Sequence, residues 1–161
     1  MRRLLILVAT IALLVVALPL SASAGPPERV SIEGPSYFDG TGVFAATGLP
    51  ECESGVLADV GGQGNPGHPV KPGFNIQIFR EFTCDESGHV FYMKLQVRVE
   101  NPLGTPADDT WKRYPTFNWI LLGGDGPFED LHMNGRGFAA YPLYDGGTVI
   151  GVYDMYEGRA H

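Results

Sequence analysis

The feature that most constrains the fold is a strict alternation of apolar and polar residues over residues 91–99. The apolar positions are Phe91, Met93, Leu95, Val97 and Val99, and the positions between them are Tyr92, Lys94, Gln96 and Arg98. Successive side chains of a β-strand point to opposite faces, so a period of two places all five apolar side chains on one face. The pattern predicts a strand with one face against a core.

A second alternating run comes just before this one. Phe74, Ile76, Ile78 and Phe82 alternate with polar residues, apart from an interruption at residues 79–80. The segment between the two runs reads Cys-Asp-Glu-Ser-Gly over residues 84–88, which has the composition of a turn. We therefore expect the two runs to form an antiparallel hairpin.

The rest of the chain after residue 24 is also rich in short β-prone segments bounded by turn residues. Strands are expected near residues 29–33, 42–48, 55–60, 111–122, 137–143 and 148–156. Asp145-Gly146-Gly147 is a good hairpin signal, and no segment has a convincing helical period. Seven or eight short strands at regular spacing predict a single all-β domain over residues 25–161, either a sandwich or a barrel.

Residues 61–73 are expected to form a loop. They contain five glycines and three prolines in thirteen residues, a composition that does not sustain a strand ladder. A surface excursion is the simpler interpretation. A lid over a pocket, or a loop that captures a partner protein, is the alternative, because loops of this length are often functional.

The N-terminus has the pattern of a signal peptide over residues 1–24. Arg2 and Arg3 are basic, residues 4–18 are apolar apart from Thr10, and residues 22–24 read Ala-Ser-Ala, a suitable cleavage site. A membrane anchor is the competing interpretation, because the apolar run approaches the length of a span. Pro19 and the small residues after it favour cleavage. We predict a secreted protein, with general secretion and twin-arginine export both open.

The two cysteines, Cys52 and Cys84, lie in the exported part of the chain. In an oxidising compartment a disulfide is the default, and it would close a loop of about thirty residues. A reactive thiol pair needs a close spacing such as Cys-x-x-Cys, which is absent. We predict a structural disulfide between Cys52 and Cys84.

The charge of the chain argues against two kinds of partner. The formal net charge is −7, and loss of the two N-terminal arginines makes the remainder more acidic. Such a domain is not expected to bind nucleic acid, or an anionic membrane after signal cleavage, through bulk electrostatics.

Motifs for catalysis or metal binding are not found. No two of the four histidines have metal-ligand spacing, His-Glu-x-x-His and Gly-x-Ser-x-Gly are absent, and the acidic cluster around residues 125–132 lacks the spacing of a calcium loop. We therefore predict no metal, cofactor or catalytic residue, and a protein without enzymatic activity is favoured. A carboxylate pair distant in sequence stays open, with Asp59 and Glu81 on predicted strands as the residues to inspect for burial.

Aromatic residues crowd the C-terminal half of the chain. Core packing explains such a set most simply, since small barrels fill their interiors with side chains. The alternative is a pocket at one mouth of a barrel for a small apolar ligand. The candidates for that pocket are Trp119, Phe128, Tyr141, Tyr144 and Tyr153.

A resemblance to a known group of barrels rests on three features. The turn Gly124-Asp125-Gly126-Pro127-Phe128, followed by Gly135 and Gly137, resembles the Gly-[Thr/Ser]-Gly-x-[Tyr/Phe] element of allene-oxide-cyclase-like and dirigent-like barrels. Phe-Thr-Cys-Asp before the long strand, and the terminus Tyr-Glu-Gly-Arg-Ala-His, resemble small secreted bacterial proteins of this kind. The likeness covers roughly residues 40–161.

The resemblance implies a single antiparallel, calycin-like β-barrel of about eight strands, with Gly124, Gly126, Gly135 and Gly137 as a structural turn at its corner. Asp125 stands where those barrels usually have Thr or Ser, and no catalytic residue is carried over. The favoured hypothesis is a secreted, non-catalytic barrel that binds a small hydrophobic or aromatic molecule. The alternatives are an isomerase or cyclase that uses the barrel cavity, and a protein-interaction or inhibitor module.

Overall fold

The part of the chain that the structure describes contains eight β-strands and one short 3₁₀ helix. The computed structural model describes residues 27–63, 74–99 and 116–161, so the predicted signal peptide and residues 64–73 and 100–115 lie outside the described residues. The elements are β1 (Glu28–Tyr37), β2 (Thr41–Thr47), β3 (Ser54–Gln63), β4 (Phe74–Cys84), β5 (Val90–Val99), β6 (Thr116–Gly124), η1 (Gly126–Phe128), β7 (Met133–Asp145) and β8 (Thr148–Ala160).

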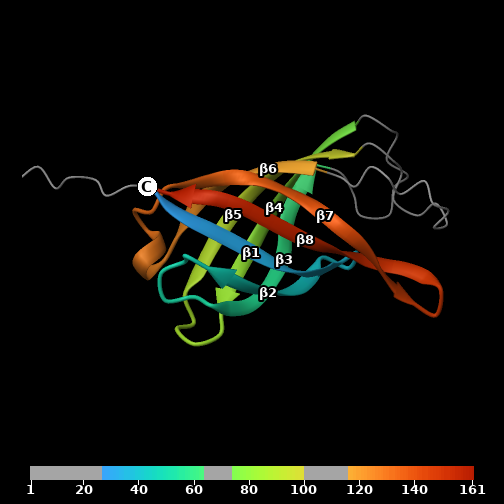
Figure 1. The fold of residues 1–161 in the computed structure, drawn as a ribbon, viewed down its shortest axis with the longest axis horizontal. Helices are drawn as coiled ribbons and strands as arrows, with labels where there is room; N and C mark the ends of the chain where they lie inside the picture. Colours follow the sequence, from blue (N-terminus) through green and yellow to red (C-terminus); the bar gives the residue numbers. More distant parts are fainter. Residues whose placement is uncertain (1–26, 64–73, 100–115) are drawn as a thin grey trace, which may run out of the picture.

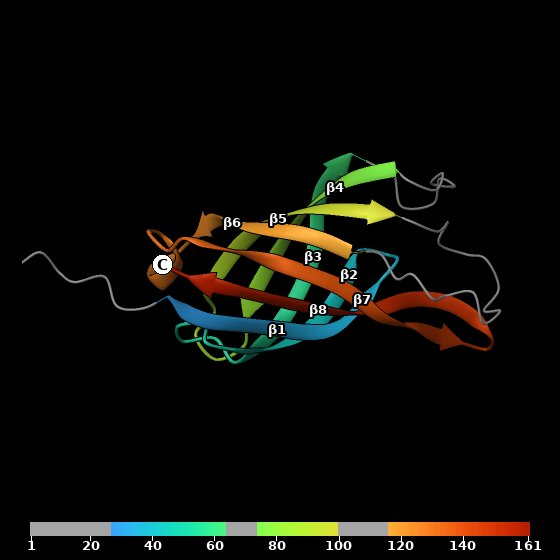
Figure 2. The same cartoon turned by 45° about the horizontal axis from the view of Figure 1, so that its top comes forward.

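The eight strands form one closed antiparallel barrel in sequence order (Figure 1, Figure 2). Each strand pairs with the next along the chain, and β1 pairs with β8 from Glu28↔Ala160 to Tyr37↔Gly151. Closure leaves no unpaired sheet edge, which is how an all-β domain of this size avoids edge-to-edge association. The predicted all-β barrel of about eight strands is confirmed.

The hairpin predicted from the two alternating runs is formed by β4 and β5. Their register is unbroken from Phe74↔Val99 to Thr83↔Val90. Phe91, Met93 and Leu95 are buried, whereas the intervening Tyr92 is exposed on the outer face. The period of two in the sequence therefore fixed both the strand and the face that it buries.

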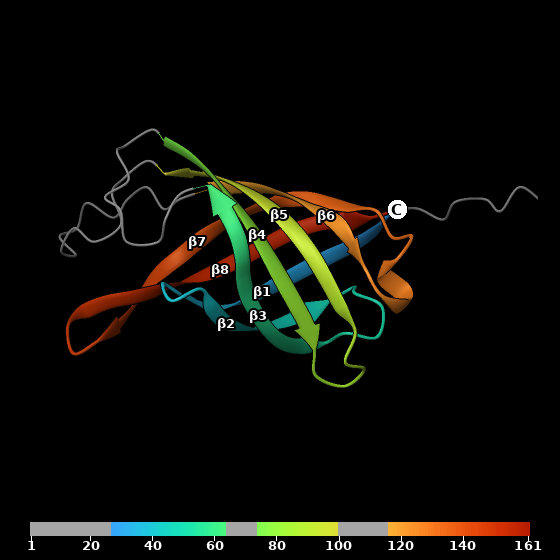
Figure 3. The ribbon, with the colours of Figure 1, turned by 180° about the vertical axis from the view of Figure 1, so that it is seen from behind.

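Several strands are longer than the sequence predicts, and β1 continues through Gly34 and Pro35 to Tyr37. β3 continues to Gln63, and Gly61 and Gly62 pair with β4 after a bulge at Asp59, so the expected loop begins later than Gly61. Glycines are tolerated there because the partner strand supplies the ladder. β7 and β8 are also longer than predicted, and their hairpin projects beyond the barrel as an arm (Figure 1, Figure 3).

The core is built mainly from aromatic rings. The rings of Phe82 and Phe91 stack with centroids 4.8 Å apart, and Phe128 from η1 stacks on Phe91 at 4.6 Å. Phe44 meets Phe82 edge to face at 5.2 Å. Contacts between rings in these geometries add to the stability that comes from burying their area.

Glycines on β7 and β8 leave room for two of the inward rings. A Cβ placed on Gly135 or Gly158 would lie 2.7 Å or 2.3 Å from the indole of Trp119, and one placed on Gly137 would lie 2.2 Å from the ring of Phe117. No Cβ is tolerated at such distances without movement. The glycine pair noted in the sequence thus marks a close approach of side chains across neighbouring strands.

Gly137→Ala should lower the free energy of unfolding by about 1–3 kcal/mol, because the new methyl group overlaps the Phe117 ring and the backbone oxygen of Met155. Gly61→Ala is the matched control, since its Cβ would meet only the Phe79 ring at 3.7 Å. Urea unfolding measures both changes. Equal effects of the two substitutions would contradict the steric explanation.

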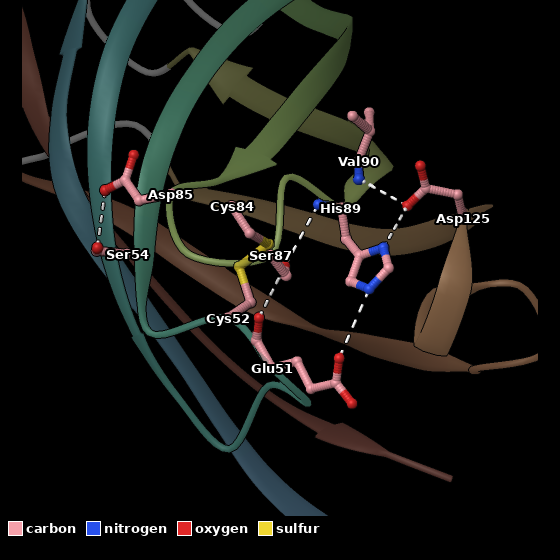
Figure 4. Close-up of a disulfide and its surroundings, with 9 residues drawn as sticks. All are labelled: Glu51, Cys52, Ser54, Cys84, Asp85, Ser87, His89, Val90 and Asp125. Carbon is pink, nitrogen blue, oxygen red and sulfur yellow. Dashed lines mark hydrogen bonds and ion pairs between the residues drawn. A yellow bond between two sulfur atoms is a disulfide. The ribbon is translucent and has the colours of Figure 1, made fainter.

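A disulfide between Cys52 and Cys84 joins the β2–β3 connection to the end of β4 (Figure 4). The Cα atoms are 5.3 Å apart, and both residues are buried. The predicted disulfide is confirmed.

Loss of the disulfide should lower the free energy of unfolding by about 3–4 kcal/mol, the chain-entropy value for a loop of this length. Cys52→Ala/Cys84→Ala tests this without leaving a free thiol, and the fully reduced wild-type protein is the matched comparison. Urea unfolding with and without reductant gives the number. If reductant left the wild-type transition unchanged, the bond would contribute nothing to stability.

Candidate functional site

The two ends of the barrel are built differently. At one end, here called the disulfide end, lie the Cys52–Cys84 bond, the β4–β5 turn and η1. At the other, the hairpin end, β1 turns into β2 and the β7–β8 arm projects (Figure 1). The aromatic core described above fills the half nearer the disulfide end.

A group of polar side chains occupies the interior nearer the hairpin end. It comprises Ser36 of β1, Asp59 of β3, Arg80 of β4, and Asp154 and Tyr156 of β8, and is called the polar cluster below. Arg80 stands two residues before the inward Phe82, and Asp154 stands two residues before the inward Tyr156. Residues two apart on a strand share a face, so both charged side chains point into the barrel.

Arg80 is the centre of the polar cluster. Its Nε donates to Asp59 Oδ1 at 2.6 Å, and its Nη2 donates to Ser36 Oγ at 2.9 Å. Its Nη1 donates to Asp154 Oδ2 at 3.0 Å and to the Tyr156 hydroxyl at 2.5 Å. One guanidinium therefore joins four strands through two ion pairs and two neutral hydrogen bonds.

Burial and charge oppose each other in the polar cluster. Burial disfavours the charged guanidinium of Arg80, but the facing oxygens of Tyr156, Asp154 and Asp59 outweigh it and raise its pKa. Burial raises the pKa of the Asp154 carboxyl, and Arg80 opposes that rise. Burial also raises the pKa of Tyr156, so its hydroxyl keeps its proton at neutral pH.

The polar cluster extends from solvent to the core. The side chain of Asp59 is 28% exposed, against 4% for Arg80 and 8% for Asp154. Asp59 stands beside the β1–β2 turn, where its backbone N–H donates to the carbonyl of Gly40. The polar cluster is thus accessible to solvent at Asp59 and shielded from solvent at Tyr156.

An apolar rim lies between the polar cluster and the hairpin end. Ile76 and Ile78 precede Arg80 on β4 with the same inward alternation, and Val152 precedes Asp154 on β8. Val152 is registered opposite Ser36, whose side chain points inward to Arg80. All three apolar side chains of this rim are half-buried.

Of the two carboxylates singled out from the sequence, one belongs to the polar cluster. Asp59 pairs with Arg80, whereas Glu81 follows Arg80 and so points to the outer face, beside Tyr92. Arg80 itself was missed and read only as an interruption of the alternation. The signal was present, because a charged residue stands in the inward register between Ile78 and Phe82.

The five aromatic candidates for a pocket are not brought together. Trp119 and Phe128 are buried in the core. Tyr141 and Tyr153 stack with ring centroids 4.9 Å apart, and Tyr153 points away from the barrel interior because it adjoins the inward Asp154. Tyr144 lies near the tip of the β7–β8 arm and is exposed.

The glycine turn lies at the disulfide end, between β6 and β7. Gly126 has φ of +53° and directly follows Asp125, whose carboxylate accepts a hydrogen bond from the backbone N–H of Val90 at 2.8 Å. The same Oδ1 lies 3.1 Å from His89 Nδ1, and His89 Nε2 lies 3.6 Å from Glu51 (Figure 4). Asp125 therefore links the β6–η1 turn to β5. The glycine turn thus has a structural role at the disulfide end of the barrel.

Two hollows are lined by residues that do not belong to the polar cluster. One of about 500 Å³ adjoins the glycine turn and Tyr92. The other, of about 900 Å³, is lined by amide side chains of β4 to β6 together with Arg136 and Glu157, and Ile76 and Phe117 also contribute to its lining. Neither contains a buried ionisable side chain, so the polar cluster is the stronger candidate site.

Arg80→Met should lower the free energy of unfolding by about 3–5 kcal/mol at pH 7, because it leaves Asp154 buried without its cation. Burial then raises the pKa of Asp154 without opposition, so the folded state binds its proton more tightly than the unfolded chain. The stability of the variant relative to wild type is therefore greater at low pH and is lost as pH rises through that raised pKa.

Arg80→Met/Asp154→Asn is the control, since it has no buried carboxyl to titrate. Urea unfolding at pH 7 and at about pH 4.5 should show a smaller penalty at the lower pH for Arg80→Met only. The same penalty at both pH values would contradict a buried, uncompensated Asp154.

These features define a class: a disulfide-bonded, eight-stranded antiparallel β-barrel with an arginine-centred polar cluster in its interior. Comparison of the chain with protein-family models, with curated proteins and with solved structures found no match. In the described ranges, no three His, Cys, Asp or Glu side chains are grouped as metal ligands. Nor does any helix there have the length and apolarity to cross a membrane.

Proposed function

We propose that this chain is a secreted barrel that binds a small apolar or aromatic molecule at the hairpin end, over the polar cluster. The observation that carries the proposal is the burial of Arg80 and Asp154 beneath an apolar rim. Binding sites in barrels combine an apolar lining with a few placed polar groups at the mouth or interior, and this end of the barrel has both.

The energetics of the polar cluster support a role beyond folding. A buried ion pair must offset the desolvation of both charges, and replacement by well-packed apolar residues is often neutral or stabilising. The other half of the same barrel is filled with aromatic rings. Folding alone does not require charged residues in this interior. The presence of Arg80 and Asp154 there therefore favours a role for them in binding.

Two sequence features agree with this proposal. The signal-peptide pattern and the disulfide fit an exported protein. The glycine turn resembles that of allene-oxide-cyclase-like and dirigent-like barrels, and the C-terminal residues resemble those of small secreted bacterial proteins. No catalytic residue is inferred from that resemblance.

A second candidate function is proton transfer to a molecule bound in the barrel, as in an isomerase or cyclase. It is favoured by one observation, the raised pKa of the buried Asp154 next to a phenol that keeps its proton. A carboxyl of this kind is suited to general acid–base chemistry. Ligand binding is its precondition, so the same first experiment applies.

The test is titration of the purified protein with N-phenyl-1-naphthylamine, a neutral apolar dye that brightens on leaving water. Wild type should bind it saturably. Val152→Phe fills the rim and should weaken binding by about tenfold or more, a loss of roughly 1.4 kcal/mol. Val56→Phe is the matched control, because Val56 is half exposed on the outer face of β3 and should leave binding unchanged.

Circular dichroism and thermal unfolding establish that both variants are folded. Binding by wild type that Val152→Phe leaves intact would place the dye outside the hairpin end. Absence of saturable binding by wild type would overturn the proposed function.

A further inference from the structure

Resting on the proposed function, we propose that the site selects molecules that carry a protonated amine on an apolar body, and that it rejects carboxylates such as fatty acids. The inference follows from the unequal numbers of donors and acceptors that the polar cluster leaves unused. The inference specifies the polar group of the ligand, whereas the apolar rim alone specifies only its apolar body.

The donors of Arg80 are nearly all used within the protein. A guanidinium has five N–H groups, and four of them donate to Asp59, Asp154, Tyr156 and Ser36. One N–H on Nη2 has no partner among the described residues. A carboxylate ligand would find neither a free fork of donors nor an uncompensated cation, which are the features that make arginine a carboxylate binder.

The acceptors are in surplus. Asp59 uses Oδ1 for Arg80, and Asp154 uses Oδ2 for both Arg80 and Tyr156. Within the described part of the chain, no hydrogen bond reaches Asp59 Oδ2 or Asp154 Oδ1. Two carboxylate oxygens, one of them on a residue that is only 6% exposed, are therefore available to a donor.

The charges of the polar cluster point the same way. One guanidinium faces two carboxylates, so the group carries a formal charge of −1 when both carboxylates are ionised. In a site of lower dielectric than water, this excess attracts a cation and repels an anion more strongly than a surface carboxylate does. An ammonium group supplies both the missing charge and three N–H donors.

The position of Asp59 sets where the amine would lie. It is the most exposed member of the polar cluster and adjoins the β1–β2 turn, and Ile78 and Val152 stand nearer the hairpin end than Arg80. A molecule that enters from this end meets the rim with its apolar body while its amine reaches Asp59.

Three ligands with the same eight-carbon chain separate the possibilities. Octylamine, octan-1-ol and octanoate are titrated into the purified wild-type protein by calorimetry at pH 7, where the amine is protonated and the acid ionised. Octylamine should bind about tenfold or more tightly than octanoate, with octan-1-ol between them. This comparison requires no variant.

Asp59→Asn removes the excess charge and replaces the free oxygen by a donor, while its amide oxygen can still accept from Arg80 Nε. It should lower the affinity for octylamine about tenfold and raise that for octanoate. Glu33→Gln is the matched control, because it removes the same charge from an exposed position on β1 outside the barrel. It should change neither affinity by more than about twofold.

The outcomes separate this inference from the proposed function. If octanoate binds wild type as tightly as octylamine, the amine preference is overturned and apolar ligand binding stands. If Glu33→Gln weakens octylamine as much as Asp59→Asn does, the preference comes from overall charge and the inference is likewise overturned. If neither these ligands nor the dye binds, the proposed function fails and the inference fails with it.

Discussion

The interaction on which the barrel interior depends is the set of hydrogen bonds made by one guanidinium. Arg80 reaches Asp59 on the neighbouring strand, and it also reaches Ser36, Asp154 and Tyr156 across the inside of the barrel. A buried charge is tolerated only where its donors are matched by oxygens held at the right places. The closed barrel does this, because β1 and β8 are fixed to each other by ten registered pairs and face β4 across the interior.

The two halves of the interior solve different packing problems. Towards the disulfide end, aromatic rings fill the barrel. Glycines on a neighbouring strand make space for inward rings, as at Gly137 beside Phe117. Towards the hairpin end, Arg80 occupies the interior instead of an aromatic ring, and its guanidinium is surrounded by side-chain oxygens of the polar cluster. Tyr156 belongs to both halves, since its ring contacts Phe82 and Phe117 while its hydroxyl accepts from Arg80.

Sequence reasoning recovered the parts of the fold that depend on local periodicity. The alternation over 91–99, the turn after Cys84 and the hairpin at Asp145 each appear as predicted. The number and spacing of the strands predicted a sandwich or a barrel, and the choice of a barrel rested on the resemblance. The disulfide followed from the presence of two cysteines in a segment predicted to be exported.

The polar cluster could not be assembled from the sequence because its members are far apart along the chain. Arg80 and Asp154 are 74 positions apart, and only strand order and closure bring them together. Each of the two is a charged residue at an inward-facing position of its strand. In the sequence, such a residue only interrupts the alternation of apolar and polar positions, and its role is visible only when the opposite strand is known. The five aromatic residues predicted to line a pocket do not lie together. Their positions could not be predicted because an aromatic ring on a strand is equally suited to the core or to the outer face.

The difference between the ends bears on where the proposed ligand would enter. At the disulfide end, a covalent bond, the Phe128 ring over Phe91 and the carboxylate of Asp125 hold three connections together, so an opening there would have to break all of these contacts. At the hairpin end the interior changes from buried to half-buried within two strand positions, from Arg80 to Ile78. Under the proposed function, a molecule that enters at the hairpin end would pass the apolar rim before it reached the polar cluster. The rim would then select its apolar body by shape, and the excess negative charge of Asp59 and Asp154 over Arg80 would select its polar group.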